Sequence, residues 1–156
     1  LNIGCGAVTS LGEDIKCLGI DLAKKLEHGA GGRKYIGAAP DITGDALELP
    51  VQDSSVDFMV VSHLFEHLID PTKALREWKR VLRPGGRVFM MMPDHSVMPS
   101  MIIDYTHVHA YTKDSLSNLL NLAPGWTLLE IEGDCAWGTI RATLVKDYED
   151  PDEVLT

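Results

Sequence analysis

The sequence predicts an α/β fold with a mostly parallel sheet, and residues 56–93 carry the main evidence. Residues 56–61 form a near-continuous apolar run, typical of a strand buried on both faces, and residues 87–92 form a second run. Between them Asp70 can cap a helix that opens with Pro71, where a missing backbone N–H costs nothing. The apolar face of this helix comprises Leu75, Trp78, Val81 and Leu82. Such a crossover indicates a right-handed βαβ unit, with functional loops at the carboxyl ends of its strands.

Length and composition bound the class of protein. With 156 residues, 45% hydrophobic and 24% charged, the chain can bury one core, so a single domain over residues 1–156 is expected. The net charge of −9 disfavours a nucleic-acid partner. Three scattered cysteines without CxxC spacing favour a reduced, cytoplasmic protein. No membrane span is expected, and the acidic residues 146–156 are expected to form a flexible tail.

The first two predicted strands each end at residues suited to a ligand. Residues 1–6, LNIGCG, indicate a strand that runs into a glycine turn, where Gly4 and Gly6 allow positive φ and a close approach of ligand to backbone. Glycine pairs also close ordinary turns, so this pattern alone leaves both interpretations open. Residues 15–21 predict a second strand with Asp21 at its carboxyl end. A carboxylate there can accept two ribose hydroxyls, or it can cap the segment that follows.

Further polar positions follow the next predicted strands. Residues 38–50 hold a short strand and then Gly44-Asp45-Ala46, which also suits an Asp-containing turn. Residues 94–110 follow the strand at 87–92, where a substrate should arrive, and they mix apolar residues with Asp94, His95, Asp104, Tyr105, His107 and His109. This mixture is typical of a lid with an apolar underside. Beyond it, Thr112 should cap a helix that runs to Ala123.

The last predicted elements form a β-hairpin. Residues 126–132 and 139–145 read as two strands joined by the sequence GDCAWG.

Residues 62–93, SHLFEHLIDPTKALREWKRVLRPGGRVFMMMP, resemble class I methyltransferases that use S-adenosylmethionine (SAM), in the branch similar to the quinone-biosynthesis enzymes. The match rests on Glu66-His67, on Asp70-Pro71 and on residues 80–86, RVLRPGG, while LNIGCG is similar to the family's first SAM-binding motif. The resemblance implies one SAM-dependent methyltransferase domain. It also implies a Rossmann-like, seven-stranded, mostly parallel sheet of order 3-2-1-4-5-7-6, with helices on both faces and an antiparallel last hairpin.

The resemblance further implies roles for single residues. The glycine loop would pass beneath the methionine portion of SAM, Asp21 would bind the ribose, and Asp45 with the N–H of Ala46 would read the adenine edge. The full set of residues expected at the cofactor is Gly4, Cys5, Gly6, Asp21, Leu22, Asp45, Ala46, Leu47, Ser62 and His63. Asn2 stands where many relatives carry an acidic residue, which weakens the expected contact with the methionine ammonium.

Histidines are the candidates for chemistry beyond cofactor binding. A hydroxyl acceptor would need a base, and His107 or His109 is the candidate, although either can equally be a structural loop histidine. We expect no metal site. His63 and His67 lie four residues apart, but no further ligand has a fixed spacing to them. The rings of His107 and His109 are expected to point to opposite sides of their segment.

The function predicted from sequence is SAM-dependent methyl transfer to a small-molecule or saccharide-type acceptor. One alternative is an NAD-dependent dehydrogenase, although GxGxxG and a second nucleotide-binding half are absent from the sequence. Another is a non-catalytic SAM-binding or partner protein, since the glycine loop begins almost at residue 1. Cover for the cofactor would then come from residues 94–111, from preceding residues or from another subunit of a homo-oligomer.

Overall fold

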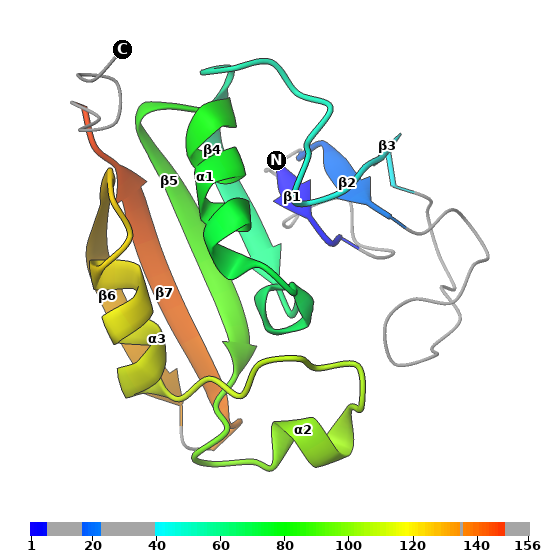
Figure 1. The fold of residues 1–156 in the computed structure, drawn as a ribbon, viewed down its shortest axis with the longest axis vertical. Coiled ribbons are helices and arrows are strands. Elements are labelled where there is room, and N and C mark those ends of the chain that lie inside the picture. Colours follow the sequence, from blue (N-terminus) through cyan, green and yellow to red (C-terminus); the bar gives the residue numbers. More distant parts are fainter. Residues whose placement is uncertain (6–16, 23–39, 135, 149–156) are drawn as a thin grey trace.

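The computed structural model describes residues 1–5, 17–22, 40–134 and 136–148, and these form a seven-stranded sheet of order β3-β2-β1-β4-β5-β7-β6 (Figure 1). The strands are β1 (Asn2–Ile3), β2 (Gly19–Asp21), β3 (Ile42–Thr43), β4 (Val56–Ser62), β5 (Leu82–Pro93), β6 (Trp126–Asp134) and β7 (Thr139–Lys146). The helices are η2 (Phe65–His67), α1 (Pro71–Val81), α2 (Ser100–Ile103) and α3 (Lys113–Asn121). The expected strand order is confirmed.

The sheet combines a parallel part with an antiparallel edge. Strand β1 pairs in parallel with both β2 and β4, β3 joins β2, and β5 joins β4. Strands β5, β7 and β6 run antiparallel, which confirms the predicted final hairpin. Because the carboxyl ends of parallel strands meet at one edge of a sheet, the ends of β1, β2, β3 and β4 lie in a row.

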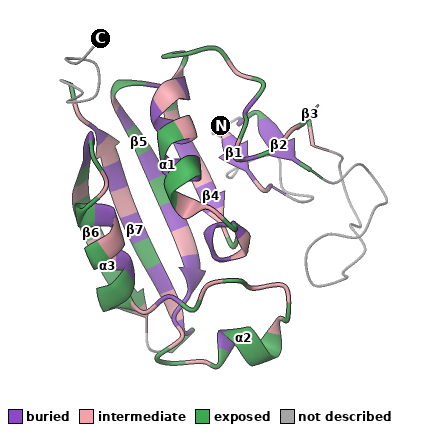
Figure 2. Cartoon of the chain, in the orientation of Figure 1, coloured by how far each residue is buried: buried purple, intermediate pink, exposed green. Residues whose placement is uncertain are grey.

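The described helices α1 and α3 lie on one face of the sheet (Figure 1). Side chains of β5 alternate accordingly: Val88, Met90 and Met92 are buried, whereas Phe89 is 42% exposed (Figure 2). Burial of β4 on both faces was predicted, yet Phe58 and Val60 are only partly buried, since the described helices cover one face. Residues 6–16 and 23–39 lie outside the described chain. No described helix is long and apolar enough to cross a bilayer.

Helix α1 begins as its sequence predicts but ends differently. Oδ1 of Asp70 accepts hydrogen bonds from the backbone N–H of Lys73 at 2.8 Å and the hydroxyl of Thr72 at 2.7 Å, and Pro71 opens the helix. The sequence predicted that the strand after this helix begins at residue 87. Instead β5 starts at Leu82, which pairs with Val56, and a register shift follows in β4. The extra pairing satisfies backbone groups that a loop would leave to water.

The second half of the chain largely follows the prediction. A capping box between Thr112 and Ser115 starts α3, which ends at Asn121 rather than Ala123. The flexible tail was expected to begin at residue 146, but this residue is part of the sheet. Lys146 is the last residue of β7, is buried, and donates from Nζ to the carbonyl of Leu82 at 3.1 Å. Residues 149–156 lie outside the described chain.

Trp78 of α1 attaches the turn after β3 to the core. Its side chain is fully buried, and Nε1 donates to the carbonyl oxygen of Ala46 at 3.0 Å. Arg80 lies two residues further along α1. Its guanidinium donates to the carbonyls of Leu49 and Val51 and forms ion pairs with Glu77 and Asp53. The Arg80 guanidinium holds the pKa of the Glu77 carboxyl below its ordinary value. Helix α1 therefore determines where the Asp45-Ala46 turn lies.

Replacing Trp78 by Ala should lower the free energy of unfolding by about 3–5 kcal/mol, because it leaves a cavity and an unpaired carbonyl at Ala46. Urea denaturation followed by circular dichroism measures the change. Trp137→Phe is the control, since Trp137 is 78% exposed, and it should change stability by less than about 0.5 kcal/mol. Equal stability of the two variants would contradict the packing described for Trp78.

Candidate functional site

The turn after β1 requires glycine at position 4. Gly4 has φ of +64°, and its N–H donates to the carbonyl of Ile20 at 2.8 Å. A Cβ at this position would lie 2.9–3.1 Å from side-chain atoms of Leu64, so both the backbone conformation and the space exclude a larger residue. Gly6, the second glycine of the predicted loop, lies outside the described residues. The described part of the turn thus approaches the loop after β4 closely.

Asp21 and Cys5 lie beside this turn. Asp21 ends β2 and is 8% exposed, and Cys5 is 6% exposed. Burial raises the pKa of the Cys5 thiol to about 11, and the negative charge of Asp21 raises it further. Leu22, the next residue, is 66% exposed. The carboxylate predicted to bind a ribose is therefore adjacent to the glycine turn, as the sequence predicts.

The loop after β3 carries Asp45, the third of the predicted cofactor-binding positions at the carboxyl edge of the sheet. The N–H of Gly44 donates to the carbonyl of Asp21 at 3.0 Å, which places the loop directly beside β2. Asp45 is exposed, and its Oδ1 accepts from the N–H of Leu47 at 2.8 Å. This is the Asp-containing turn that the sequence left open as an alternative. The turn uses one carboxylate oxygen of an exposed side chain, so it is compatible with a ligand contact.

Ser62 and His63 stand at the tip of β4, as predicted. Ser62 ends the strand, opposite Met91 of β5. His63 follows with φ of +50°, and its N–H donates to the carbonyl of Met91 at 2.8 Å. The His63 side chain is half exposed, with Nδ1 3.5 Å from Oε1 of Glu66. This uncommon backbone conformation turns the chain from β4 into η2.

Glu66 joins the loops after β4 and β5. Its main-chain carbonyl accepts from the N–H groups of Val108 at 3.0 Å and His109 at 3.1 Å. The side chain of His107 is consequently held at η2, with Nε2 3.8 Å from Oε1 of Glu66 and 3.9 Å from Oδ2 of Asp104. The hydroxyl of Thr106 donates to Asp104 and holds the pKa of that carboxyl below its ordinary value.

His67 completes this group. Its ring centroid lies 4.6 Å from that of His107, edge to face, and its Nδ1 is 3.2 Å from the carbonyl oxygen of Thr106. The ligand atoms of Glu66, His67 and His107 all lie within 4.8 Å of one another. As a possible metal ligand, His67 was paired in the sequence only with His63. Two features of the sequence pointed toward this group: the Glu66-His67 pair and the cluster of titratable residues beyond β5. Neither feature predicts that the two segments contact each other, because that contact forms only in the folded protein.

Both His107 and His109 point inward, so the expectation of opposite sides was wrong. The His107 side chain is 8% exposed, and Nε2 of His109 is buried, whereas Val108 between them is 47% exposed. Residues two apart in an extended segment share a face, and the hydrogen bonds to Glu66 direct that face toward η2. The ring of His109 lies 5.5 Å from that of Tyr111. Burial raises the pKa of the Tyr111 phenol, and the charge of Glu66 raises it further.

The segment over this edge differs from the predicted lid. Helix α2 has four residues, and Ile102, Ile103 and Tyr105 are 83%, 66% and 83% exposed. These apolar side chains thus face outward in the described structure rather than lining an underside.

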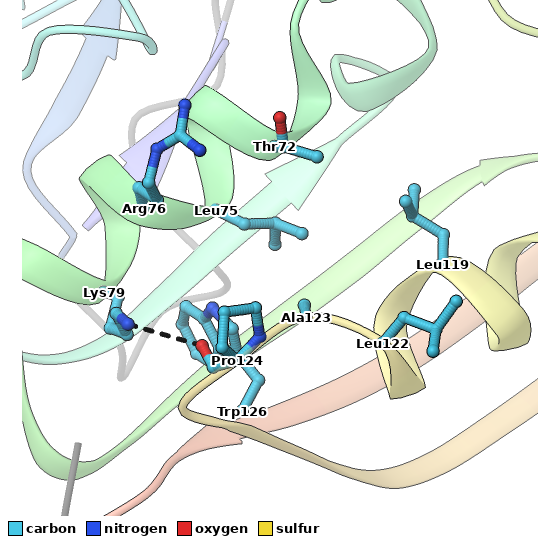
Figure 3. Close-up of a pocket in the computed structure, with 9 residues that line it drawn as sticks. All are labelled: Thr72, Leu75, Arg76, Lys79, Leu119, Leu122, Ala123, Pro124 and Trp126. Atoms are coloured by element: carbon cyan, nitrogen blue, oxygen red, sulfur yellow. Dashed lines mark hydrogen bonds between the residues drawn. The ribbon is translucent and has the colours of Figure 1, made fainter. Parts of the chain in front are cut away.

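A cavity of about 440 Å³ lies between α1 and α3 (Figure 3). Lys79 spans it from α1 and donates to the carbonyl of Pro124 at 3.3 Å. Its walls include Leu75, Leu119 and Trp126, and none of the residues predicted at the cofactor. The cavity is therefore separate from the edge formed by the strand ends.

Residues 1–90 match the family described as "Methyltransferase domain". The chain belongs to this methyltransferase-domain family. The match includes the glycine turn, Asp21, Asp45 and η2, and it ends before the segment that carries His107 and His109. The resemblance to class I methyltransferases is thereby confirmed, and the cofactor that the family implies is SAM.

Several curated relatives are similar to this methyltransferase domain. An uncharacterized protein of transposon TN4556 from Streptomyces fradiae is 36% identical over 72% of the chain and 35% of its own length. The 27-O-demethylrifamycin SV methyltransferase of Amycolatopsis mediterranei is 33% identical, over 60% of the chain and 39% of its own. The ubiquinone/menaquinone biosynthesis C-methyltransferase of Caulobacter is 48% identical, over 38% and 24%. The matched region thus covers less than half of each relative.

The fold likeness extends over almost the whole domain. A SAM-dependent methyltransferase structure from Mesorhizobium loti superposes with a TM-score of 0.67 over 93% of this chain and 89% of that one. At 14% identity this likeness concerns the fold alone.

The raised pKa of Cys5 predicts slow alkylation in the folded protein. Because its pKa is about 11, the thiolate is scarce at pH 8, and the rate with iodoacetamide should still be rising at pH 10. Mass spectrometry of the peptide containing Cys5 measures the rate. The same peptide in urea should level off above a pKa of about 8.5. A plateau near pH 9 in the folded protein would contradict the raised pKa.

Proposed function

We propose that this domain binds SAM along the carboxyl ends of β1 to β4 and transfers its methyl group to a small-molecule acceptor. The observation that carries the proposal is the row formed by Gly4, Asp21 and Asp45, which lie at or just after the carboxyl ends of β1, β2 and β3. A nucleoside without phosphates can be bound by a carboxylate that accepts from the ribose hydroxyls and by polar groups that hydrogen-bond to the edge of the base. This row offers both kinds of group. The family match supports the proposal.

Each loop has a proposed part in holding SAM. Gly4, Cys5 and Gly6 would pass beneath the methionine portion, and Asp21 with Leu22 would contact the ribose. Asp45, Ala46 and Leu47 would bind the adenine. Ser62 and His63 would lie nearest the sulfonium, since they stand at the tip of the central strand β4.

Methyl transfer from SAM requires alignment more than activation of the donor. The methyl group is already bound to a positively charged sulfur, so the acceptor atom must be held in line behind it at about 3 Å. Glu66 and Asp104 beside the tip of β4 make the acceptor side acidic, which suits a cationic sulfonium before transfer. Release of a neutral thioether then removes the positive charge.

For the acceptor we propose a hydroxyl-bearing small molecule of saccharide type. One relative is named for a 27-O-demethyl substrate and another as a C-methyltransferase, so the shared fold serves acceptors of different kinds. A hydroxyl acceptor needs a group to take its proton, and His107 or His109 is proposed for this role. The burial of Nε2 of His109 without a hydrogen-bond partner among the described residues supports a nitrogen reserved for a ligand.

Asp21→Asn should weaken SAM binding by about tenfold or more. A hydrogen bond to a charged group contributes about 1.5–3 kcal/mol, and 1.4 kcal/mol corresponds to a factor of ten. Isothermal titration with SAM measures the affinity. Asp57→Asn is the matched control, because Asp57 is an exposed residue of β4 paired with Arg83. Unchanged affinity of the Asp21 variant, or no SAM binding by the intact protein at millimolar ligand, would refute the proposed cofactor site.

Replacing His107 and His109 together by Ala should lower the single-turnover rate by about 10²–10⁴-fold if one of them is the base. The acceptor for this assay would be found by screening cell extracts with labelled SAM. An unchanged rate would remove both histidines from the mechanism, and SAM binding without any methylated product would favour a non-catalytic SAM-binding protein.

A further inference from the structure

We propose that Glu66, His67 and His107 bind a divalent first-row transition-metal cation beside the tip of β4. The three residues each offer one ligand atom, and these atoms lie within 4.8 Å of one another. Ligands bound to a zinc-sized ion at about 2.0–2.1 Å stand roughly 3.3 Å apart in tetrahedral geometry. Side-chain adjustments of about 1 Å would therefore close the group around an ion.

Burial of the Glu66 carboxylate is the first argument for a cation. The residue is 2% exposed, and neither carboxylate oxygen has a hydrogen-bond partner among the described residues. Burying an ionised carboxylate without compensation is expensive, and buried charges are normally paired or coordinate metals. Nδ1 of His63 at 3.5 Å and Nε2 of His107 at 3.8 Å pair with Oε1 of this carboxylate, but both distances are longer than a charge-assisted hydrogen bond.

The orientation of His67 is the second argument. Its Nδ1 lies 3.1 Å from the hydroxyl oxygen of Thr106 and 3.2 Å from the carbonyl oxygen of the same residue. Because that hydroxyl donates its proton to Asp104, both oxygens accept from His67, and the proton of the ring is on Nδ1. In the neutral ring Nε2 then keeps its lone pair for a ligand. Metal-binding histidines typically donate their other N–H to a carbonyl or carboxylate in this way. Unlike Nδ1 of His67, Nδ1 of His107 is buried without a hydrogen-bond partner among the described residues.

The ligand set selects the class of ion. Two imidazoles and one carboxylate suit Zn²⁺, Fe²⁺, Mn²⁺ or Co²⁺, whereas Mg²⁺ and Ca²⁺ prefer ligand sets made of oxygen alone. Three protein ligands leave at least one coordination position open, as in catalytic metal sites. The site therefore fits an exchangeable oxygen ligand, such as water or a hydroxyl group.

The role of the ion in the reaction rests on the proposed function. An acceptor hydroxyl bound at the open position would become more acidic and lose its proton to a base. His107, as a ligand, would leave His109 as the candidate for that base. An oxygen lone pair would then form the bond to the methyl carbon while the carbon–sulfur bond breaks. Its electron pair would stay on sulfur, and the products would be the methyl ether and neutral S-adenosylhomocysteine.

Metal titration of the wild-type protein tests the site directly. Protein depleted of metal with a chelator would be titrated with Co²⁺, followed by visible absorption, and with Zn²⁺ in competition. We expect one ion per chain. Glu66→Gln and His107→Ala should each weaken the affinity at least about tenfold. His95→Ala is the matched control, because His95 belongs to the same segment but pairs with the hydroxyl of Ser100, and its affinity should equal that of wild type.

A second measurement uses only the wild-type protein, so it still tests the metal site if the variants do not fold. Proton NMR of the Co²⁺-loaded wild-type protein should show hyperfine-shifted ring N–H signals from two histidines. The inference is overturned if the wild type binds no Co²⁺, if Glu66→Gln and His107→Ala bind it as tightly as wild type, or if the shifted signals do not come from two histidines.

Titration of the metal-free protein with S-adenosylhomocysteine separates this inference from the proposed function. If the nucleoside binds and Co²⁺ does not, the metal site alone is refuted. If Co²⁺ binds and the nucleoside does not, the metal site stands, and the proposed function falls together with the role given to the acceptor hydroxyl.

Discussion

The parallel pairing of β1 with β2 on one side and β4 on the other is the interaction on which the site depends. Strand β1 has two residues, yet its hydrogen bonds align Ile3 with both Ile20 and Val61. This register brings three strand ends, and the loops that follow them, to a single edge. Gly4 can continue β1 into that edge because it adopts positive φ against Leu64.

A second constraint joins the two halves of the site. The main-chain carbonyl of Glu66 receives two N–H groups from the segment beyond β5, so that segment is attached to η2 by backbone rather than by side chains. Substitution of the side chains there can therefore change the chemistry without detaching the segment. The segments that follow β4 and β5 are therefore held together at the carboxyl edge of the sheet.

The family match does not extend over the whole of this edge of the sheet. The family match covers residues 1–90 and so includes the whole row of strand ends. His107 and His109 lie beyond it, in a loop at the carboxyl end of a strand. Loops at this position carry specificity on α/β folds because the sheet holds them in place without restricting their sequence. The buried carboxylate of Glu66 lies within the matched region, and its Oε1 is 3.8 Å from Nε2 of His107 in this loop.

Local physical chemistry in the sequence was enough to place α1, because the cap of Asp70, Pro71 and an apolar face at helical spacing act within one segment. The hairpin and the glycine turn were equally local, while the order of the strands came from the family resemblance. Pairing across the sheet decided that residues 83–86 extend β5, since Leu82 finds a partner in Val56. Only the tertiary structure brought His107 to Glu66 and His67. Their apposition depends on two loops docking through backbone hydrogen bonds, and no spacing along the chain records such a long-range contact.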